Sequence, residues 1–228
     1  MTAPRTFAIA DIHGCCSTFC RLLERIGITR YDSLYLLGDY IDRGPDSRGV
    51  IEKIITLQHD GYQIHPLIGN HEDLLLQAAG FSDPGDPLMW LCNGGVETLH
   101  SYGVDSPRQI PEKHLLFLES LPPVAWTDTH VFVHGGLDFS LDDPVRDTSR
   151  EIMLWDRDRD VIDNRTIGGR KLVTGHTIYS LEAIRESISG DLIRLDNGCF
   201  LGSGYAGEGN LVALEVGTGR LYVQKNIE

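Results

Sequence analysis

LYLLGDYIDRG, residues 34–44, joins an apolar run to a turn that holds two carboxylates and a guanidinium. Leu34–Leu37 has the composition of a short buried β-strand, and Asp39, Asp42 and Arg43 follow it directly. A surface loop would explain this segment taken alone. Whether it carries chemistry depends on where the other polar side chains of the chain fall.

Four further apolar strands end in the same way, in polar residues mixed with glycines. These strands are FAIA (7–10), HPLI (65–68), VFV (131–133) and LVT (172–174). The polar residues that follow them are Asp11, His13, Asn70, His71, His134 and His176. In open α/β sheets, ligands bind outside the carboxyl ends of the strands. We therefore expect these side chains to meet in one site.

The types of these side chains limit the chemistry of that site. Imidazole, carboxylate and amide oxygen, without thiolate, suit Mn, Fe, Zn, Co or Mg. The set is too large for one tetrahedral ion but fits two ions that share a bridging carboxylate. Two-metal sites clamp both oxygens of an in-line phosphoryl displacement and lower the pKa of a bound water from ~15.7 towards ~7. The sequence thus predicts a centre that hydrolyses phosphate compounds.

Hydrophobic periodicity predicts the fold around this site. Strands are expected at 6–10, 33–37 and 62–68, alternating with helices at 17–27, 46–59 and 71–79, which favours a parallel sheet. Further strands are expected at 129–134, 171–175, 191–196, 211–216 and 220–225. We expect one α/β (α+β) domain over 1–228, with two mixed β-sheets packed as a central sandwich flanked by helices.

Two segments are predicted to lie outside this sandwich. Residues 80–127 are rich in Pro, Gly and Trp and are expected to form an inserted helical cap, with helices near 88–101 and 111–120. Residues 200–210 contain four glycines and are expected to form a flexible loop near the site.

Charge and composition restrict the partners. The formal net charge of −13 disfavours nucleic acid and anionic membranes, so a phosphorylated substrate would need a local positive centre. No apolar run approaches the ~20 residues of a membrane span, and we expect no signal peptide before the first strand. Five cysteines without CxxC spacing indicate free thiols in a cytoplasmic protein. We expect a monomer.

Five ordered motifs between positions 11 and 177 resemble the phosphoprotein phosphatase family, within the calcineurin-like metallophosphoesterases. They are Asp11-x-His13-Gly14, Gly38-Asp39-x-x-Asp42-Arg43-Gly44, Gly69-Asn70-His71-Glu72, His134-Gly135-Gly136 and Gly175-His176-Thr177. The chain is similar in length to the compact bacterial and phage-type members. MWLCNGG (89–95) and LWDR (154–157) resemble their secondary motifs. The resemblance implies the metallophosphoesterase fold.

The resemblance also implies a role for each site residue. The first ion would be held by Asp11, His13 and the bridging Asp39, and the second by Asp39, Asn70, His134 and His176. Manganese is the expected metal at both positions. The general acid would be His71, oriented and kept cationic by Asp42. The phosphoryl oxygens would be bound by Arg43 and Arg157, with Arg159 as a competing choice for the second arginine.

Two enzyme activities compete as the substrate class. The first is hydrolysis of phosphomonoesters, as by a serine/threonine or dual-specificity phosphoprotein phosphatase. The alternative is that of the symmetrical diadenosine tetraphosphate hydrolases, which typically show GDLVARG, GNHD, HAG and GHW where this chain has GDYIDRG, GNHE, HGG and GHT. A phosphate leaving group departs readily, whereas a serine alkoxide needs a proton donor. The Asp42–His71 pair therefore favours the phosphomonoester.

Two other classes of protein remain open at this point. A catalytically silent metal-binding module would be expected to have lost His71 or a ligand, and none is missing from the motifs. A phosphodiesterase or nuclease on the same scaffold is disfavoured by the acidic charge and by the paired arginines, which suit a terminal phosphate.

Overall fold

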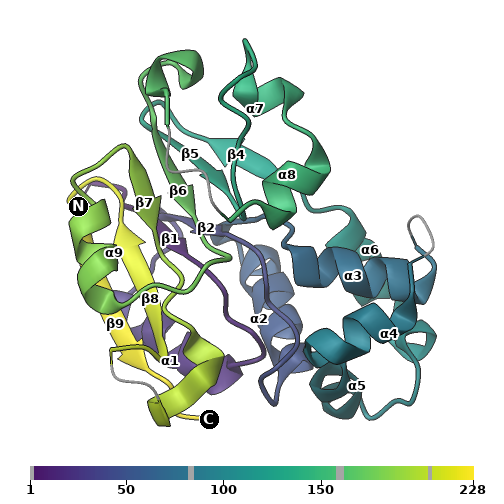
Figure 1. The fold of residues 1–228 in the computed structure, drawn as a ribbon. Helices are drawn as coiled ribbons and strands as arrows, with labels where there is room; N and C mark the ends of the chain where they lie inside the picture. Colours follow the sequence, from purple (N-terminus) through teal and green to yellow (C-terminus); the bar gives the residue numbers. More distant parts are fainter. Residues whose placement is uncertain (1–2, 82–84, 158–161, 205–206) are drawn as a thin grey trace.

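The computed structural model describes residues 3–81, 85–157, 162–204 and 207–228. Two mixed β-sheets lie face to face at the centre, with helices on their outer faces (Figure 1). The first sheet has the strand order β3-β2-β1-β8-β9, and the second has the order β4-β5-β6-β7. The predicted sandwich of two mixed sheets with flanking helices is confirmed.

The first sheet contains the βαβαβα run that the periodicity predicts. Its strands β1 (Thr6–Ile9), β2 (Ser33–Leu36) and β3 (Gln63–Pro66) are parallel, and α1 (Cys16–Ile26) and α2 (Ser47–His59) connect them. Helix α3 (Asn70–Ala79) follows β3. The remaining strands, β8 (Asn210–Glu215) and β9 (Arg220–Lys225), are antiparallel additions at the β1 edge.

The second sheet is parallel apart from one edge strand. Strands β5 (His130–Val133), β6 (Lys171–Thr174) and β7 (Leu192–Arg194) run parallel, and β4 (Val124–Trp126) is antiparallel to β5. The sequence did not predict β4 or the short helices α7 (Pro144–Asp147), α8 (Arg150–Trp155) and α9 (Leu181–Ser187). Segments of three to seven residues contain too few turns for a period to emerge.

Residue alternation along the strands builds three core clusters, one between the sheets and one on the outer face of each sheet. Phe7 and Ile9 of β1 face the helices, whereas Ala8 and the following Ala10 face the second sheet. Between the sheets, the rings of Tyr35 and Phe132 stack with centroids 4.1 Å apart. Because the central strands are buried on both faces, their sequences read as continuous apolar runs.

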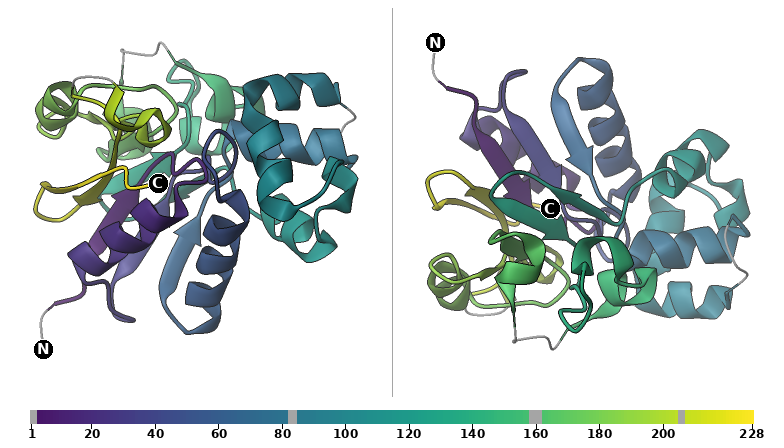
Figure 2. Two further views of the ribbon diagram at one scale, coloured as in Figure 1. Left: turned by 90° about the horizontal axis from the view of Figure 1, so that it is seen from below. Right: turned by 90° about the horizontal axis from the view of Figure 1, so that it is seen from above.

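The helical part of the predicted cap segment, residues 80–127, packs beside α3 and α2 (Figures 1 and 2). It contains α4 (Pro87–Trp90), a π-helical turn at Leu91–Gly95, α5 (Val96–Tyr102), a 3₁₀ turn at Pro107–Gln109 and α6 (Glu112–Glu119). The helices predicted near 88–101 and 111–120 are therefore both present, but the first is not continuous. The helix is interrupted at Gly94, where φ is 105° and a Cβ would lie 2.7 Å from the backbone nitrogen of Arg43. The end of the cap segment was predicted wrongly, because Val124–Trp126 is strand β4 of the second sheet.

The glycine-rich segment at 200–210 also differs in part from the prediction. Cys199–Gly204 forms a 3₁₀ turn in place of the expected loop. Its Phe200 ring lies edge-on to His13, with centroids 5.1 Å apart, so the predicted position near the site is confirmed. A further 3₁₀ turn spans Asn164–Ile167.

Other surface and composition features follow the sequence. All five cysteines are free thiols. Among the described residues, no helix combines the length and the apolar character that crossing a bilayer requires.

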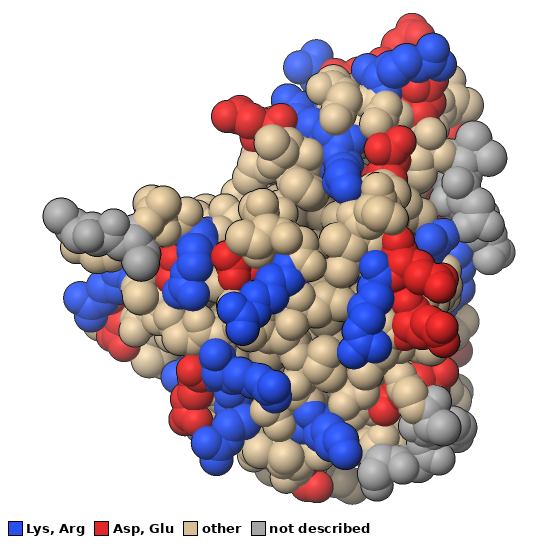
Figure 3. All heavy atoms as spheres, turned by 90° about the vertical axis from the view of Figure 1, so that its left-hand side faces the viewer, with Lys and Arg blue, Asp and Glu red and all other residues tan. Residues whose placement is uncertain are grey.

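Lys and Arg side chains are spread over the face that carries α9 and β9, on the far side of the molecule from α4–α6 (Figure 3).

Candidate metal centre

The loops that leave β1 and β2 are bound to each other through their backbones. The N–H of His13 donates to the Asp39 carbonyl, and the N–H of Gly14 donates to the Tyr40 carbonyl, both at 2.8 Å. A Cβ at Gly175, which follows β6, would collide with the Asp11 carboxylate. The carboxyl ends of strands from both sheets therefore meet at one place, as the sequence predicts.

Backbone strain is concentrated at this meeting point. Among the described residues, six that are not glycine have positive φ, and every one is a predicted site residue: Asp11, His13, Asp39, Asp42, Arg43 and His176. A left-handed conformation at a non-glycine residue costs of order 1–2 kcal/mol. Such a cluster is retained only where the surrounding structure and the task of the site require it.

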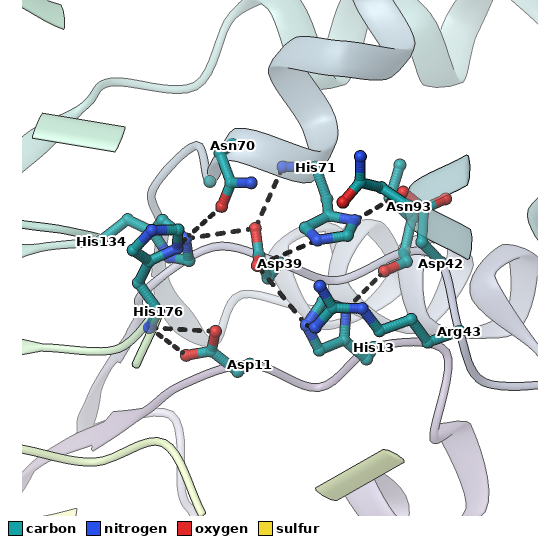
Figure 4. A network of polar contacts seen from close by, with 12 residues as sticks. Asp11, His13, Asp39, Asp42, Arg43, Asn70, His71, Asn93, His134 and His176 are labelled. Atoms are coloured by element: carbon teal, nitrogen blue, oxygen red, sulfur yellow. Dashed lines mark hydrogen bonds and ion pairs between the residues drawn. The ribbon is translucent and has the colours of Figure 1, made fainter. Parts of the chain in front are cut away.

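Asp39 lies at the centre of the cluster, with imidazoles on two sides (Figure 4). Its Oδ1 is 3.3 Å from Nε2 of His134, and its Oδ2 is 3.5 Å from Nε2 of His13. The residue is 2% exposed. One carboxylate with its two oxygens directed at different histidines has the arrangement of a bridging ligand.

His134 is surrounded by the other side chains that are predicted to bind the second ion. Its Nε2 lies 2.8 Å from Oδ1 of Asn70 and 3.1 Å from Nδ1 of His176. These two atoms and Asp39 Oδ1 surround the same nitrogen, so four predicted ligands of one ion converge. Their residues follow β2, β3, β5 and β6, far apart in the sequence.

Backbone carbonyls fix the protonation of two of these rings. Nδ1 of His13 is 2.9 Å from the Ile41 carbonyl, and Nδ1 of His134 is 2.8 Å from the Leu37 carbonyl. A carbonyl only accepts, so Nδ1 carries the proton and Nε2 presents its lone pair to the centre. This orientation of a metal-binding histidine by an outer hydrogen bond is general in metal sites.

The pKa values separate these histidines from His71. Burial lowers the pKa of His13 and His134, and burial together with His134 lowers the pKa of His176 to about 3. Metal binding requires the neutral imidazole, so these rings are suited to be ligands. His71 is different: burial lowers its pKa, but Asp39 and Asp42 more than offset this, and the pKa lies above its usual value.

His71 is held by a buried carboxylate and its hydrogen-bond donors. Nδ1 of His71 lies 2.7 Å from Oδ2 of Asp42. Burial raises the pKa of Asp42, and the hydrogen bonds from His71 and Thr98 act in the opposite direction. The indole N–H of Trp90 donates to both oxygens of Asp42, at 3.1 and 3.0 Å, and the Thr98 hydroxyl donates at 2.6 Å. With so many donors on Asp42, the shared proton belongs on His71.

Asp11 is close to the centre, and its carboxylate is bound by the backbone of the loop after β6. Both its oxygens accept from the backbone N–H of His176 at 3.1 Å. In the described part of the chain, two buried groups of three residues could each hold an ion: His13–Asp39–His71 and Asp39–His134–His176. Within each group, the candidate ligand atoms all lie within 4.8 Å of one another. Asp11 is in neither group, and its role as a ligand of the first ion stays a prediction.

The two predicted phosphate-binding arginines reach the site from different sides. Nη1 of Arg43 lies 2.9 Å from Nε2 of His13, and its guanidinium lies over the Phe200 ring, 4.5 Å from the centroid. Nη1 of Arg157 donates to the His176 carbonyl at 2.9 Å. Arg159 lies outside the described residues, so the choice between Arg157 and Arg159 is untested.

Glu72 has a larger part in the site than the sequence indicated. This residue lies in the first turn of α3 and is fully buried. Its carboxylate accepts from the backbone N–H groups of Asp39, Tyr40 and Gly69 at 2.8–2.9 Å. Burial and Asp39 raise the pKa of Glu72 to about 8, while the Tyr40 N–H acts against this rise. Glu72 thus fixes the loop that carries the central carboxylate.

Three further residues contribute to the site without having been assigned a role from the sequence. Trp90 and Thr98 bind Asp42 from the cap segment. Asp196, after β7, is buried, and burial raises its pKa to about 7. Asp196 and Asp39 both raise the pKa of Asp11 after burial, which shows how much negative charge the centre collects. Divalent cations would offset that charge.

The donor set fits two divalent ions that share Asp39. Imidazole nitrogens with lone pairs directed inward, an amide oxygen and several buried carboxylates are the ligands that Mn, Fe, Zn, Co and Mg accept. The buried histidine and aspartate groups agree with the predicted dimetal centre.

Comparisons with known proteins agree with this site. Residues 4–177 match the model of the calcineurin-like phosphoesterase family. A symmetrical bis(5'-nucleosyl)-tetraphosphatase of Acidovorax sp. (strain JS42) is 47% identical over 74 residues, which are 32% of this chain and 25% of that protein. The corresponding enzyme of Nitrosomonas europaea is 44% identical over 78 residues, 33% of this chain and 28% of its own. The match thus spans about a quarter of each relative.

Solved structures that share the fold include several kinds of phosphatase. A putative diadenosine tetraphosphatase superposes with a TM-score of 0.59 at 20% identity, covering 97% of this chain and 93% of its own. A Saccharomyces cerevisiae serine/threonine phosphatase similar to human PP5 gives 0.66 at 17% identity, covering 99% and 81%. A cold-active protein-tyrosine phosphatase of Shewanella gives 0.66 at 15%, covering 98% and 81%. At such identities the likeness shows the fold alone.

Proposed function

This chain belongs to the calcineurin-like phosphoesterase family, and from that premise we propose that it hydrolyses phosphate monoesters, with phosphoserine and phosphothreonine in proteins as the substrate class. The coarser activity, metal-dependent phosphoester hydrolysis, follows from the family and the buried ligand groups. One contact supports the finer proposal, the buried ion pair between His71 and Asp42.

That pair matters because of the leaving group. A serine or threonine alkoxide is a strong base and departs slowly unless it receives a proton in the transition state. A nucleotide leaving from a phosphoanhydride is a weak base and departs without such help. An imidazole with a raised pKa, held by a buried carboxylate, is a proton donor suited to the first case.

The residues of the chain divide the work as follows. Two divalent ions, when bound, stabilise negative charge on the phosphoryl oxygens and make hydroxide available near neutral pH. Arg43 and Arg157 bind the phosphoryl oxygens through planar guanidinium groups. His71 gives its proton to the departing oxygen, and Asp42 holds the ring in place and stabilises its cationic form. The guanidinium of Arg43 stacks over the ring of Phe200, a cation–π contact.

Symmetrical cleavage of diadenosine tetraphosphate is the second candidate function. It is supported by the named sequence relatives, which are symmetrical bis(5'-nucleosyl)-tetraphosphatases. As far as sequence comparison goes, this candidate has better support than protein dephosphorylation. The matched stretches cover about a third of this chain, so the activity of the whole relatives does not carry over directly.

One experiment separates the two candidates. The protein is reconstituted with Mn²⁺, and kcat/KM is measured for a phosphoserine peptide and for diadenosine tetraphosphate under the same conditions, with p-nitrophenyl phosphate as a general reporter. We expect the phosphopeptide to be the better substrate. A higher kcat/KM for diadenosine tetraphosphate would replace our proposal with the second candidate. Activity towards p-nitrophenyl phosphate that survives demonstrated removal of the metal would contradict both.

A further inference from the structure

A groove lies beside the metal centre, with Asn93 and Trp155 among its lining residues. It has a volume of about 690 Å³ and lies between α3, α4 and α8. Its wall along α3 is formed by Asp73, Leu74 and Gln77, which follow His71 on the same helix. Asn93, which also lines the groove, lies near His71 and Asp42 (Figure 4), so the groove opens next to the general acid, on the side of the leaving group.

Two lining residues, Trp155 and Asn93, connect the groove to the site. Trp155 lies edge-on to His176, with ring centroids 6.2 Å apart. Asn93 lines the groove beside Gly94, whose carbonyl accepts from the backbone N–H of Arg43 at 3.2 Å. A molecule whose phosphate occupies the centre would therefore extend directly into the groove.

The lining of the groove combines apolar and acidic side chains. Met89 is 56% exposed and Trp155 39%, so both offer apolar surface to a ligand. Asp73, Asp86 and Glu151 contribute three carboxylates. Among the lining residues that the structure describes, Arg150 is the one cation. It lies 3.0 Å from Asp73, and this ion pair leaves the groove with an excess of negative charge.

The charge of the surrounding segment has the same sign. Residues 80–127 contain six Asp and Glu but two Lys and Arg. The basic side chains visible in Figure 3 lie on the opposite face of the molecule, away from this segment. A polyphosphate that entered the groove would meet carboxylates at close range, whereas a cationic chain would be attracted.

We propose that this groove binds the polypeptide on the leaving-group side of the substrate and selects phosphorylated serine or threonine with lysine or arginine nearby. The inference rests on the proposed phosphomonoesterase function. Aliphatic stems of lysine and arginine pack well on exposed Met89 and Trp155, while their charged ends reach Asp86 and Glu151. The groove is therefore a determinant of sequence preference and not of the chemical step.

The test compares two phosphoserine peptides of equal length, one flanked by arginines and one by glutamates. For the wild-type protein we expect kcat/KM to favour the arginine peptide on the order of tenfold at low salt, and less at high salt. In the double variant D86N/E151Q the ratio of the two kcat/KM values should fall towards one. Asn retains the ability of Asp86 to cap α4, and the ratio cancels any general loss of activity.

A matched control has the same change of charge elsewhere on the cap segment. The double variant E112Q/E119Q changes two exposed carboxylates of α6 and should keep the wild-type ratio. Equal kcat/KM values for the two peptides in the wild type would overturn the groove proposal while leaving phosphomonoesterase activity in place. The same ratio in both double variants would also overturn it. Failure to hydrolyse either peptide, with rapid cleavage of diadenosine tetraphosphate, would overturn the proposed function itself.

Discussion

Nδ1 of His71 lies 2.7 Å from Oδ2 of Asp42, a contact between residues 29 positions apart with side chains 1% and 0% exposed. His71 lies in the first turn of α3 and Asp42 in the loop after β2. The cap segment closes over the pair through Trp90 and Thr98, which donate to Asp42. A neutral imidazole would need no such environment. The contact makes the general acid the part of the site most specific to the proposed chemistry.

Replacing Asp42 by asparagine should therefore affect substrates unequally. We expect kcat for a phosphoserine peptide to fall by about 10²–10⁴, the usual contribution of general acid catalysis, and kcat for p-nitrophenyl phosphate to fall far less. The falling limb of the pH–rate profile should move to lower pH, because the carboxylate that raises the pKa of His71 is lost. Elemental analysis should find the metal content unchanged.

The exposed Asp105 provides the control, since D105N changes the same charge away from the site. An equal fall in kcat for both substrates would indicate that Asp42 acts through the structure of the site and not through the proton. Loss of metal from D42N would point the same way.

Glu72 offers a second prediction, on the geometry of the central loop. In E72Q, an amide NH₂ would face backbone N–H donors that now bind a carboxylate oxygen. An unsatisfied buried donor costs about 1–3 kcal/mol, so we expect the free energy of unfolding to fall by about that amount in urea titrations. The affinity for Mn²⁺ should fall as well, because Asp39 is no longer fixed.

E119Q, on the exposed surface of α6, is the control for this substitution. If E72Q matches the wild type in both urea midpoint and Mn²⁺ affinity, Glu72 does not hold the loop as we infer.

The sequence predicted the residues of the site more completely than it predicted the helices of the cap segment. Asp39, His134 and His176 each follow a short apolar strand. Parallel strands place their carboxyl ends at the same edge of a sheet, independently of the conformation of the loops. The break at Gly94 depends on a tertiary contact with the backbone of Arg43, which no helical period reveals. The role of Glu72 was missed for the same reason, because the backbone N–H groups that donate to it lie in a loop more than 30 positions earlier.

A third prediction concerns stability, far from the metal centre. Asp32 accepts from the backbone N–H and the guanidinium of Arg5 and from Thr29, at 2.8–3.2 Å. Burial alone would raise the pKa of Asp32, but these hydrogen bonds more than offset it and hold the pKa well below its usual value. A lowered folded-state pKa stabilises above the unfolded pKa of about 3.9 and loses that effect as the pH falls.

We therefore expect D32N to lower the free energy of unfolding at pH 7 by roughly 2 kcal/mol. The difference from the wild type should shrink steadily below about pH 4, as the wild-type carboxylate takes up its proton. Urea titrations at several pH values measure this directly. D128N, at an exposed position, should follow the wild type throughout, and a D32N difference independent of pH would contradict the role given to the ion pair.

The arrangement around Asp39 predicts how metal binding responds to single substitutions. Its two oxygens face different histidines, His13 and His134, at 3.5 and 3.3 Å. After reconstitution with Mn²⁺ and desalting, the wild type should retain two ions per chain, H13A and H134A about one each, and D39N fewer than either. The exposed His59, replaced by alanine, should leave the wild-type value unchanged. Elemental analysis gives the count without reference to activity. One ion in fully active protein, or complete loss from H13A alone with its fold intact, would show that Asp39 does not join two separate sites.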